Sequence, residues 1–508
     1  MSMDAWLCSA GAVGLGDLEI ADFPETGRGV RAKRQFKQGE RILTIPASCL
    51  WTFEHAYADP LLGPVLRSVQ PSLSVEDTLA LYILFVRSRP QDTKYQGFQN
   101  HVAAMPSSYS MSIFFTDDEL EICAGSSLHT LTTQLRGRVG DDYKQLLLRV
   151  LTRHRQLFPL DKFTIQDYKW ALCTIWSRGM DFTITQGNSV RLIAPFADMF
   201  NHSPNVKQCH AYDPSTGDLT VLAGKDYEVG DQVFIYYGPV PNSRLLRLYG
   251  FVMPENANNS YDLVVQTSPL APLYELKERL WKLAGLELTS TIPLTLADPL
   301  PNDLLRYLRI QRLDESDLGP MTLQIASGKS EKVSNANETQ VLQFLIGSFH
   351  ALLATFKTPL ETLEAQLSDG GMYPPGSNSW AAAQVSVGEQ QVLRLAKTKA
   401  ESLLAAITDG SGSALLSDHH HGDASKTWNS AILSKCKWFT EYCAWKPAWQ
   451  LGFDLDPSRR RYDAVYRNME AKGHLTGAMK QRIDENFEHD MYNYREQYFI
   501  DGGIETGT

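Results

Sequence analysis

The chain has 508 residues, too many for one compact core, so its length predicts two or three domains. Hydrophobic residues make up 43% of the chain and charged residues 21%, as is ordinary for a soluble globular protein. The net charge of -10 argues against a general nucleic-acid binder, whose binding surface would be basic. No apolar run reaches the ~18 residues that a membrane span needs.

The N-terminus and the cysteines favour an intracellular protein, cytoplasmic or nuclear. The stretch MSMDAWLCSAGAVGLGD has neither the basic start of a secretory signal nor an Arg- and Ser-rich amphipathic pattern. The seven cysteines are scattered, odd in number and without a CxxC pair. This pattern fits reduced thiols and argues against a structural zinc site. We therefore expect no targeting signal and no membrane association.

The first part of the chain changes from strands to helices. Residues 18–51 are predicted to form short strands, because their apolar residues recur with a period near two and Gly and Pro separate the segments. From 52 to about 180 the pattern is helical, with candidate helices at 76–88 and 141–157. A third helix begins at Thr164, where TIQD resembles a capping box.

Strands return after residue 180, in the segments SVRLIAP, CHAYDP, DLTVLAG and QVFIYYG. Residues 213–218 (DPSTGD) have the turn chemistry of a hairpin. From about 266 to 407 the spacing of apolar residues is mainly helical, and the composition of residues 408–427 is typical of a linker. A sheet assembled from both strand groups would carry the helical part as an insertion.

One apolar stretch, APFADMFNHSPNVKQCH at 194–210, contains three strong hydrogen-bonding side chains, Asp198, Asn201 and His202. Such side chains often satisfy local backbone groups, which is a purely structural interpretation. A metal site formed by Asp198, His202 and His210 is a second interpretation, although the spacing matches no common zinc pattern.

A third interpretation uses two further motifs. NHS occupies 201–203, FIYYGPVPNSRLLRLYGFV follows at 234–252, and a Gly-rich turn, TGRGVRA, lies at 26–32. In this order and at these separations, the motifs resemble those of SET-domain protein methyltransferases. The resemblance is to the subgroup that contains the plant Rubisco large-subunit lysine methyltransferases and the actin-histidine methyltransferase. It covers roughly residues 18–407.

The resemblance implies an α+β fold: a SET domain of small β-sheets with a pseudoknot, in which the NHS segment passes under the loop that carries the tyrosine. The SET domain would span 18–265 with a helical insertion at about 52–180. A mainly α-helical substrate-binding domain would span 266–407, and 408–508 would be a linker and an aromatic, charged tail without an assigned role. The implied partners are S-adenosylmethionine and a protein substrate that presents a lysine to a monomeric enzyme. No nucleic acid and no metal are implied.

The resemblance also assigns the cofactor-binding residues. Glycines without Cβ atoms allow a ligand close to the backbone, and a guanidinium fork suits the carboxylate of the cofactor. Asn201 would meet the amino-acid end of the cofactor and His202 the adenine edge, with its ring serving the pseudoknot. The expected cofactor-binding residues are Gly27, Arg28, Gly29, Arg178, Asn201, His202 and Phe251.

Tyr237 is the expected catalytic residue, because its hydroxyl would orient the attacking amine and accept weak C–H···O contacts from the methyl group. It is expected at the end of an apolar strand, where alternation makes Tyr236 the rival on the opposite face. Met180, Asp198 and Tyr249 are the expected substrate-facing residues. No dedicated base is evident, so the amine would lose its proton to water.

Lysine is the expected target. The histidine-modifying relative has Asn where Met180 stands and Trp where Ala197 stands, and a thioether offers no amide to an imidazole. A histidine-directed enzyme and a catalytically silent SET-like scaffold remain alternatives. A metal hydrolase that uses Asp198 and His202 is a further alternative.

Overall fold

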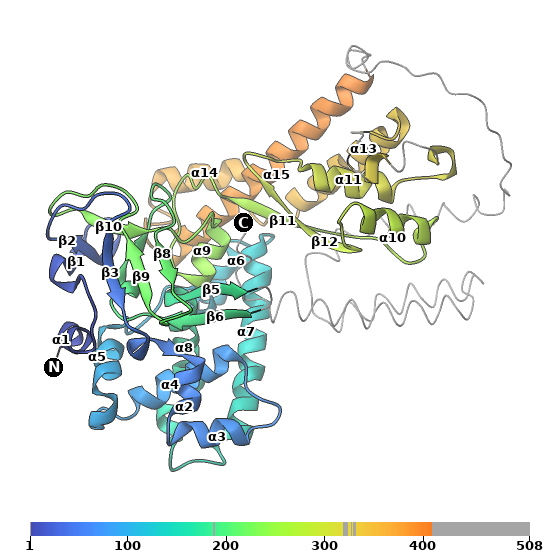
Figure 1. The fold of residues 1–508 in the computed structure, drawn as a ribbon. Coiled ribbons are helices and arrows are strands. Elements are labelled where there is room, and N and C mark those ends of the chain that lie inside the picture. The colour runs from blue at the N-terminus through green and yellow to red at the C-terminus, as the bar shows by residue number, and fades with distance from the viewer. Residues whose placement is uncertain (1, 186–187, 319–323, 327, 329–331, 409–508) are drawn as a thin grey trace.

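A computed structural model describes residues 2–185, 188–318, 324–326, 328 and 332–408 of the chain. The predicted tail, with the His419–His421 triplet, therefore lies outside the described residues. Figure 1 shows the small sheets beside a group of helices from the first half of the chain, with the later helices extending away from them. Within the described ranges, no helix has the length and the apolar character of a membrane span.

Three small sheets each combine strands from before the helical insertion with strands from after it. This arrangement confirms the prediction that the helices interrupt one sheet-forming unit. The first sheet has the order β1 (Leu18–Phe23), β2 (Gly27–Ala32), β10 (Gln232–Ile235), β7 (Asn201–His202). The second is β3 (Arg41–Ile45), β9 (Leu219–Leu222), β8 (His210–Tyr212), and the third is β4 (Trp51–Thr52), β6 (Asn188–Ile193), β5 (Gly179–Thr185).

The short strand β7 is the point where distant segments interlace. It pairs in parallel with β10, with Asn201 opposite Phe234 and His202 opposite Ile235. The backbone N–H of Ser203 then donates to the carbonyl of Ile235 at 3.1 Å. The NHS segment thus lies directly against the strand that leads to Tyr237, as the pseudoknot prediction requires.

The insertion is helical, as predicted, and its helices surround one apolar core. Ser74 caps one helix, and the Thr164–Asp167 capping box predicted from TIQD starts another. The predicted helix at 141–157 begins earlier, at Ser127, and ends in a π-helical turn at Leu147–Leu151. The helices are α2 (Phe53–Ala58), α3 (Leu62–Ser68), α4 (Val75–Arg87), α5 (Gln96–Ala104), α6 (Asp117–Glu121), α7 (Ser127–Leu146) and α8 (Ile165–Arg178), of which α6 packs in a separate small cluster. The helix α1 (Met3–Ser9) precedes the insertion and packs in the core of the sheets.

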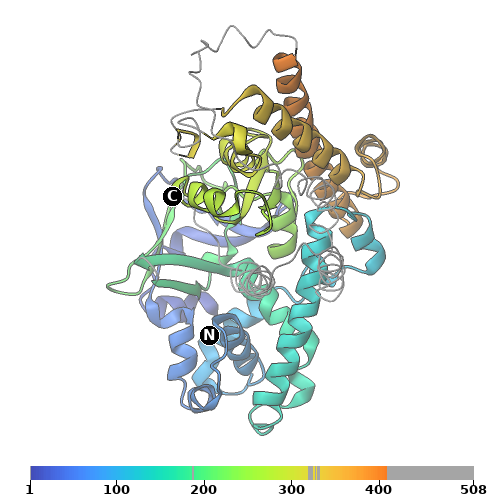
Figure 2. The same ribbon diagram turned by 90° about the vertical axis from the view of Figure 1, so that its right-hand side faces the viewer.

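The C-terminal region has a separate core, in which Trp281 stacks on Tyr307 with their ring centroids 4.9 Å apart. Figure 2 shows the long helix α15 running along the outside of this region. Its elements are β11 (Ser260–Gln266), α10 (Tyr274–Leu283), β12 (Thr289–Thr295), α11 (Asn302–Gln311), α13 (Asn335–Leu353), α14 (Leu360–Asp369) and α15 (Asn378–Thr408). The helix α9 (Asn242–Leu248) precedes them and contacts α7, α8 and α15.

The antiparallel pair β11–β12 is a feature that the sequence analysis missed. Tyr261, Leu263 and Val265 of β11 are buried in the C-terminal core. The predicted domain limit at 265 therefore falls inside a strand that packs with the helices after it. The limits of the domains remain a prediction.

Candidate functional site

The polar stretch begins at a sharp turn. Phe196 is buried and has a φ of 71°, which is unusual for a residue other than glycine. The turn leads into a single 3-10 turn, Ala197–Met199, that places Asp198 in the interior. Aromatic burial at Phe196 offsets the strain of the backbone, so the position of Asp198 depends on tertiary packing.

Asp198 lies at the centre of a buried polar chain that runs from the insertion to the sheet. Arg178 Nη1 donates to Asp198 Oδ2 at 2.9 Å and to the Asp198 carbonyl at 3.1 Å. His101 Nε2 lies 2.9 Å from the same Oδ2, and Trp51 Nε1 donates to His101 Nδ1 at 2.8 Å. An indole N–H can only donate, so Nδ1 is the accepting nitrogen and Nε2 carries the proton that points at Asp198.

This environment keeps Asp198 ionised. Burial by itself favours the neutral acid, but the charge of Arg178 and the hydrogen bonds from His101 and Arg178 outweigh it and lower the pKa of Asp198 below its usual value. The carboxylate is therefore negative throughout the neutral range, although it is removed from water. All of the hydrogen bonds to its side chain fall on Oδ2.

Asn201 ties the Gly-rich turn to the crossing. Its Nδ2 donates to the carbonyls of Thr26 at 3.3 Å and of Arg28 at 3.1 Å. A Cβ on Gly29 would lie 3.0 Å from Asn201 Nδ2 and 2.4 Å from Gln232 Nε2, so a larger residue would require these two side chains to shift. The structure thus brings the predicted residues 27–29 to Asn201, and it uses the amide nitrogen of Asn201 to hold the turn.

Tyr237 is anchored by the same segment. Its backbone N–H donates to His202 Nδ1 at 3.1 Å, and its hydroxyl donates to the carbonyl of Phe200 at 2.8 Å. Burial raises the pKa of Tyr237, so the phenol stays protonated. The ring of His202 thereby serves the crossing, as predicted.

The expectation that Tyr237 ends a strand is wrong. β10 ends at Ile235, and both tyrosines of YYG follow it, so strand alternation cannot decide between them. Tyr236 packs on His202 with the ring centroids 5.8 Å apart, whereas Tyr237 lies 5.1 Å from His202 and also stacks on Tyr249 at 4.9 Å. Phe251 continues this aromatic row, 6.3 Å from Tyr249. Met180 is buried in the core cluster against which Tyr237 packs.

Several buried polar atoms of this region have no hydrogen-bond partner among the described residues: Asp198 Oδ1, Arg178 Nε, His202 Nε2 and, beside the Gly-rich turn, Gln232 Nε2. Buried polar groups are normally satisfied, so each missing partner needs an explanation. Oδ1 is an anionic acceptor and Arg178 Nε is a cationic donor. His202 Nε2 carries the proton of its ring, because Nδ1 accepts from Tyr237. Asp198 Oδ1, Arg178 Nε and His202 Nε2 therefore offer one acceptor and two donors to a ligand.

The residues of the metal interpretation do not assemble. Within the described ranges, no three His, Cys, Asp or Glu side chains form a group able to hold a metal ion, so Asp198, His202 and His210 do not. Burial lowers the pKa of His210 to about 4, and its ring packs on Phe182 at 5.8 Å.

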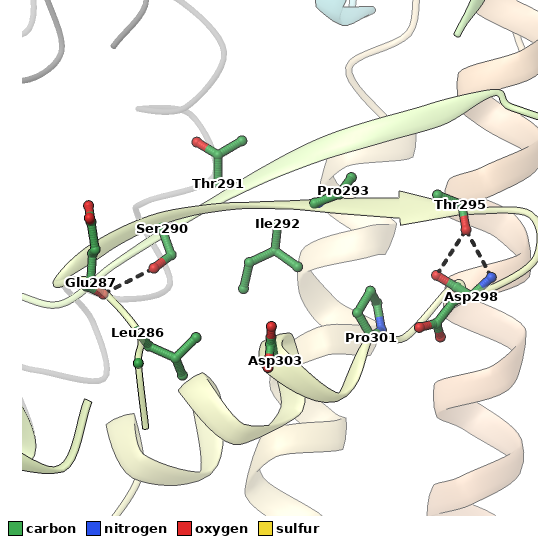
Figure 3. Close-up of a pocket in the computed structure, with 11 residues that line it drawn as sticks. Leu286, Glu287, Ser290, Thr291, Ile292, Pro293, Thr295, Asp298, Pro301 and Asp303 are labelled. Atoms are coloured by element: carbon green, nitrogen blue, oxygen red, sulfur yellow. Dashed lines mark hydrogen bonds between the residues drawn. The ribbon is translucent and has the colours of Figure 1, made fainter. Parts of the chain in front are cut away.

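A separate pocket of about 410 Å³ lies in the C-terminal region, and none of the predicted site residues lines it. Figure 3 shows it between β12 and α11, with Asp298 N–H donating to Thr295 Oγ1 at 2.9 Å on one wall. Its lining includes Glu287, Ile292 and Asp303.

Comparison with known families agrees with this geometry. Residues 27–238 match the SET domain family, and residues 268–393 match the Rubisco LSMT substrate-binding family. The chain carries a SET domain followed by a Rubisco LSMT substrate-binding domain. A third match, to the prokaryotic phospholipase A2 family, covers residues 418–501, which lie outside the described part of the chain.

Curated relatives of this SET protein include the actin-histidine N-methyltransferases of Canis lupus familiaris and Homo sapiens. They are 28% and 27% identical over 394 residues, which is 74% of this chain. The match spans about two thirds of each relative, 65% and 64% of its length. The solved structure of Rubisco LSMT bound to AdoMet is similar in fold, with a TM-score of 0.68 and 23% identity over 80% of this chain and 92% of that one. A structure of the SET domain of LSMT bound to lysine and AdoHcy gives the same values.

His101 and Trp51 are the residues of the site that the sequence analysis missed. His101 lies in α5 and is fully buried, yet its carboxylate partner is 97 positions away in the chain. A lone histidine in a helix gives no local signal of such a contact.

Proposed function

We propose that this protein is an S-adenosylmethionine-dependent protein methyltransferase of the SET type. The observation that carries the proposal is the set of unpartnered buried atoms on Asp198, Arg178 and His202, beside a phenol held by the same crossing. S-Adenosylmethionine has an ammonium, a carboxylate and an adenine ring, which match an anionic acceptor, a cationic donor and a neutral donor. The names of the relatives and of the similar structures support the same activity.

In this proposal the cofactor would be held by Arg178, Asp198, Asn201, His202, Phe251 and the turn Gly27–Arg28–Gly29. Arg178 Nε would bind the carboxylate and Asp198 Oδ1 the ammonium, since each atom is buried and lacks a partner. When bound, the cofactor supplies an electrophilic methyl group on a sulfonium. The chain's own contribution is alignment, which can supply ~7–11 kcal/mol of a barrier.

Tyr237 is the proposed catalytic residue. Its hydroxyl hydrogen is committed to the Phe200 carbonyl, so its oxygen lone pairs can accept from the attacking amine and from polarised C–H groups. Tyr249 and Met180 would line the channel of the target side chain. A lysine has a free pKa of about 10.4, and aromatic walls disfavour its charged form, so it would lose its proton to water before attack.

We propose lysine as the target, because the thioether of Met180 offers an imidazole no amide as a hydrogen-bond partner. Histidine is the second candidate, favoured by the names of the curated relatives. A catalytically silent scaffold is the third. The phospholipase-family match in the tail has no part in the proposal.

Transfer of labelled methyl groups to matched lysine and histidine peptides tests the target. Label on lysine supports the proposal, and label on histidine alone contradicts it.

Tyr237→Phe tests the catalytic role: cofactor binding measured by calorimetry should persist while turnover falls by about 10²-fold or more. A wild-type protein that binds the cofactor but labels no protein in a cell lysate would indicate the scaffold.

A further inference from the structure

The helix that follows the catalytic loop carries a positive cluster that the SET site does not use. α9 bears Arg244 and Arg247, three residues apart and therefore on one face of the helix. It lies between the two family matches, since the SET match ends at 238 and the substrate-binding match begins at 268. α9 also contacts α7, which contributes Arg138.

The two arginines of α9 are not neutralised by the protein. Within the described residues, no hydrogen bond or ion pair holds the side chain of either Arg244 or Arg247. Arg247 is half-buried, and its Nε is buried without a partner. Asp262 of β11 partly offsets the charge of Arg247 but forms no ion pair with it, and Arg138 has Asp142 at 4.0 Å.

Arg247 keeps its charge at neutral pH. Burial, together with the neighbouring charges of Arg244 and Arg138, lowers the pKa of Arg247 to about 10, which leaves the guanidinium protonated. Like charges that are held close together cost free energy, and Asp262 offsets part of the charge of Arg244 and Arg247. In a chain with a net charge of -10, this concentration of positive charge therefore calls for an external anion.

The cluster adjoins the proposed substrate channel. Tyr249 directly follows α9, stacks on Tyr237 at 4.9 Å, and lies within reach of the positive charge of Arg244. A group bound by Arg244 and Arg247 would thus lie close to the side chain that enters the channel.

We infer that Arg244, Arg247 and Arg138 form a recognition surface for an acidic segment of the protein substrate, flanking the residue that is methylated. This inference rests on the proposed function for its setting, and it names the substrate class: a target residue with Asp or Glu nearby in the folded or extended chain. Guanidinium groups suit carboxylates because each can donate two parallel hydrogen bonds. Such a pairing also speeds encounter and selects the register of the bound segment.

The test measures binding without turnover. Fluorescein-labelled lysine peptides that differ only in their flanking residues, Glu, Gln or Lys, are titrated with the full chain, and anisotropy reports binding. The acidic peptide should bind at least about 10-fold more tightly than the Gln peptide, and added salt should reduce the difference. In R244Q/R247Q the preference should vanish, and in R244E/R247E it should invert toward the Lys-flanked peptide.

Matched controls separate recognition from misfolding. R244K/R247K keeps the charge and should retain most of the preference, whereas R153Q/R155Q removes two exposed arginines elsewhere and should leave the preference unchanged. Equal binding of the three peptides by the wild type, or an undiminished preference in R244Q/R247Q, would overturn the inference. Tighter binding of a single-stranded oligonucleotide than of the acidic peptide would also overturn it, in favour of a nucleic-acid site.

The outcomes distinguish this inference from the proposed function. A protein that binds the acidic peptide through Arg244 and Arg247 but transfers no methyl group keeps the inference and contradicts the function. A protein that methylates acidic and neutral peptides equally, with or without the two arginines, keeps the proposed function and contradicts the inference.

Discussion

Two buried arginine–carboxylate pairs, one in each half of the molecule, are built differently. In the C-terminal region, Arg309 binds Glu338 through two hydrogen bonds of 2.7 Å, Nε to Oε2 and Nη2 to Oε1. In the SET domain, Arg178 and His101 both bind one oxygen of Asp198, and the other oxygen has no partner in the part of the chain that the structure describes. The first pair is complete within the protein, and the second is open on one side. Polar satisfaction, rather than burial or charge, therefore separates a structural pair from a candidate ligand site.

The largest expected effect comes from breaking the closed pair. Arg309→Met leaves the Glu338 carboxylate buried and unpaired, so the free energy of unfolding should fall by about 3–5 kcal/mol. Chemical denaturation of the full chain measures this loss. Arg309→Met/Glu338→Leu is the matched control: it removes both charges and should recover most of the stability. A single variant as stable as the wild type would show that the pair contributes nothing.

A change in the open pair, Arg178 and Asp198, should alter the affinity for the cofactor. Asp198→Asn removes the anionic acceptor proposed for the cofactor ammonium, and hydrogen bonds to charged groups contribute about 1.5–3 kcal/mol. The affinity for S-adenosylmethionine, measured by calorimetry, should therefore fall by about 10- to 100-fold. Asp118→Asn, on an exposed position of α6, is the control. Unchanged affinity in Asp198→Asn would mean that Oδ1 does not face the cofactor.

A third buried carboxylate, Glu389 of α15, extends the comparison, because its hydrogen-bond partner is a serine and not an arginine. Ser127 donates to it through its backbone N–H at 2.8 Å and through its hydroxyl. Burial outweighs these bonds and raises the pKa of Glu389 to about 7. In the unfolded chain the carboxyl releases its proton near pH 4.5, so stability should fall as the pH rises from about 4.5 to about 7.

Glu389→Gln should abolish that part of the pH dependence, because an amide has no proton to release in this range. Unfolding of the wild type and the variant at a series of pH values measures it. Parallel stability curves for the two proteins would contradict the assignment.

The parts of the fold that the sequence predicted have local causes. The capping box at Thr164 and the alternation in residues 18–51 are properties of short windows, and both appear in the structure. β12 was missed because Pro293 interrupts its pattern, and proline within a run argues against a strand.

The site was only partly predictable, because only some of its contacts arise from local sequence motifs. The motifs around Asn201 and Tyr237 identified the segments that interlace. No motif links Trp51 and His101 to Asp198, because that contact arises from the packing of α5 against the third sheet. The backbone conformation of Phe196 likewise has no signal, since nothing in its residue type favours a positive φ.

The parallel pairing of Asn201 with Phe234 has a consequence for biosynthesis. A nascent chain that has emerged only as far as residue 230 can complete every helix of the insertion, yet it lacks the strand against which the NHS segment must lie. The candidate site around Asp198 is therefore completed late during translation. A product truncated before β10 would therefore fail to bind the cofactor, even if its helices fold well.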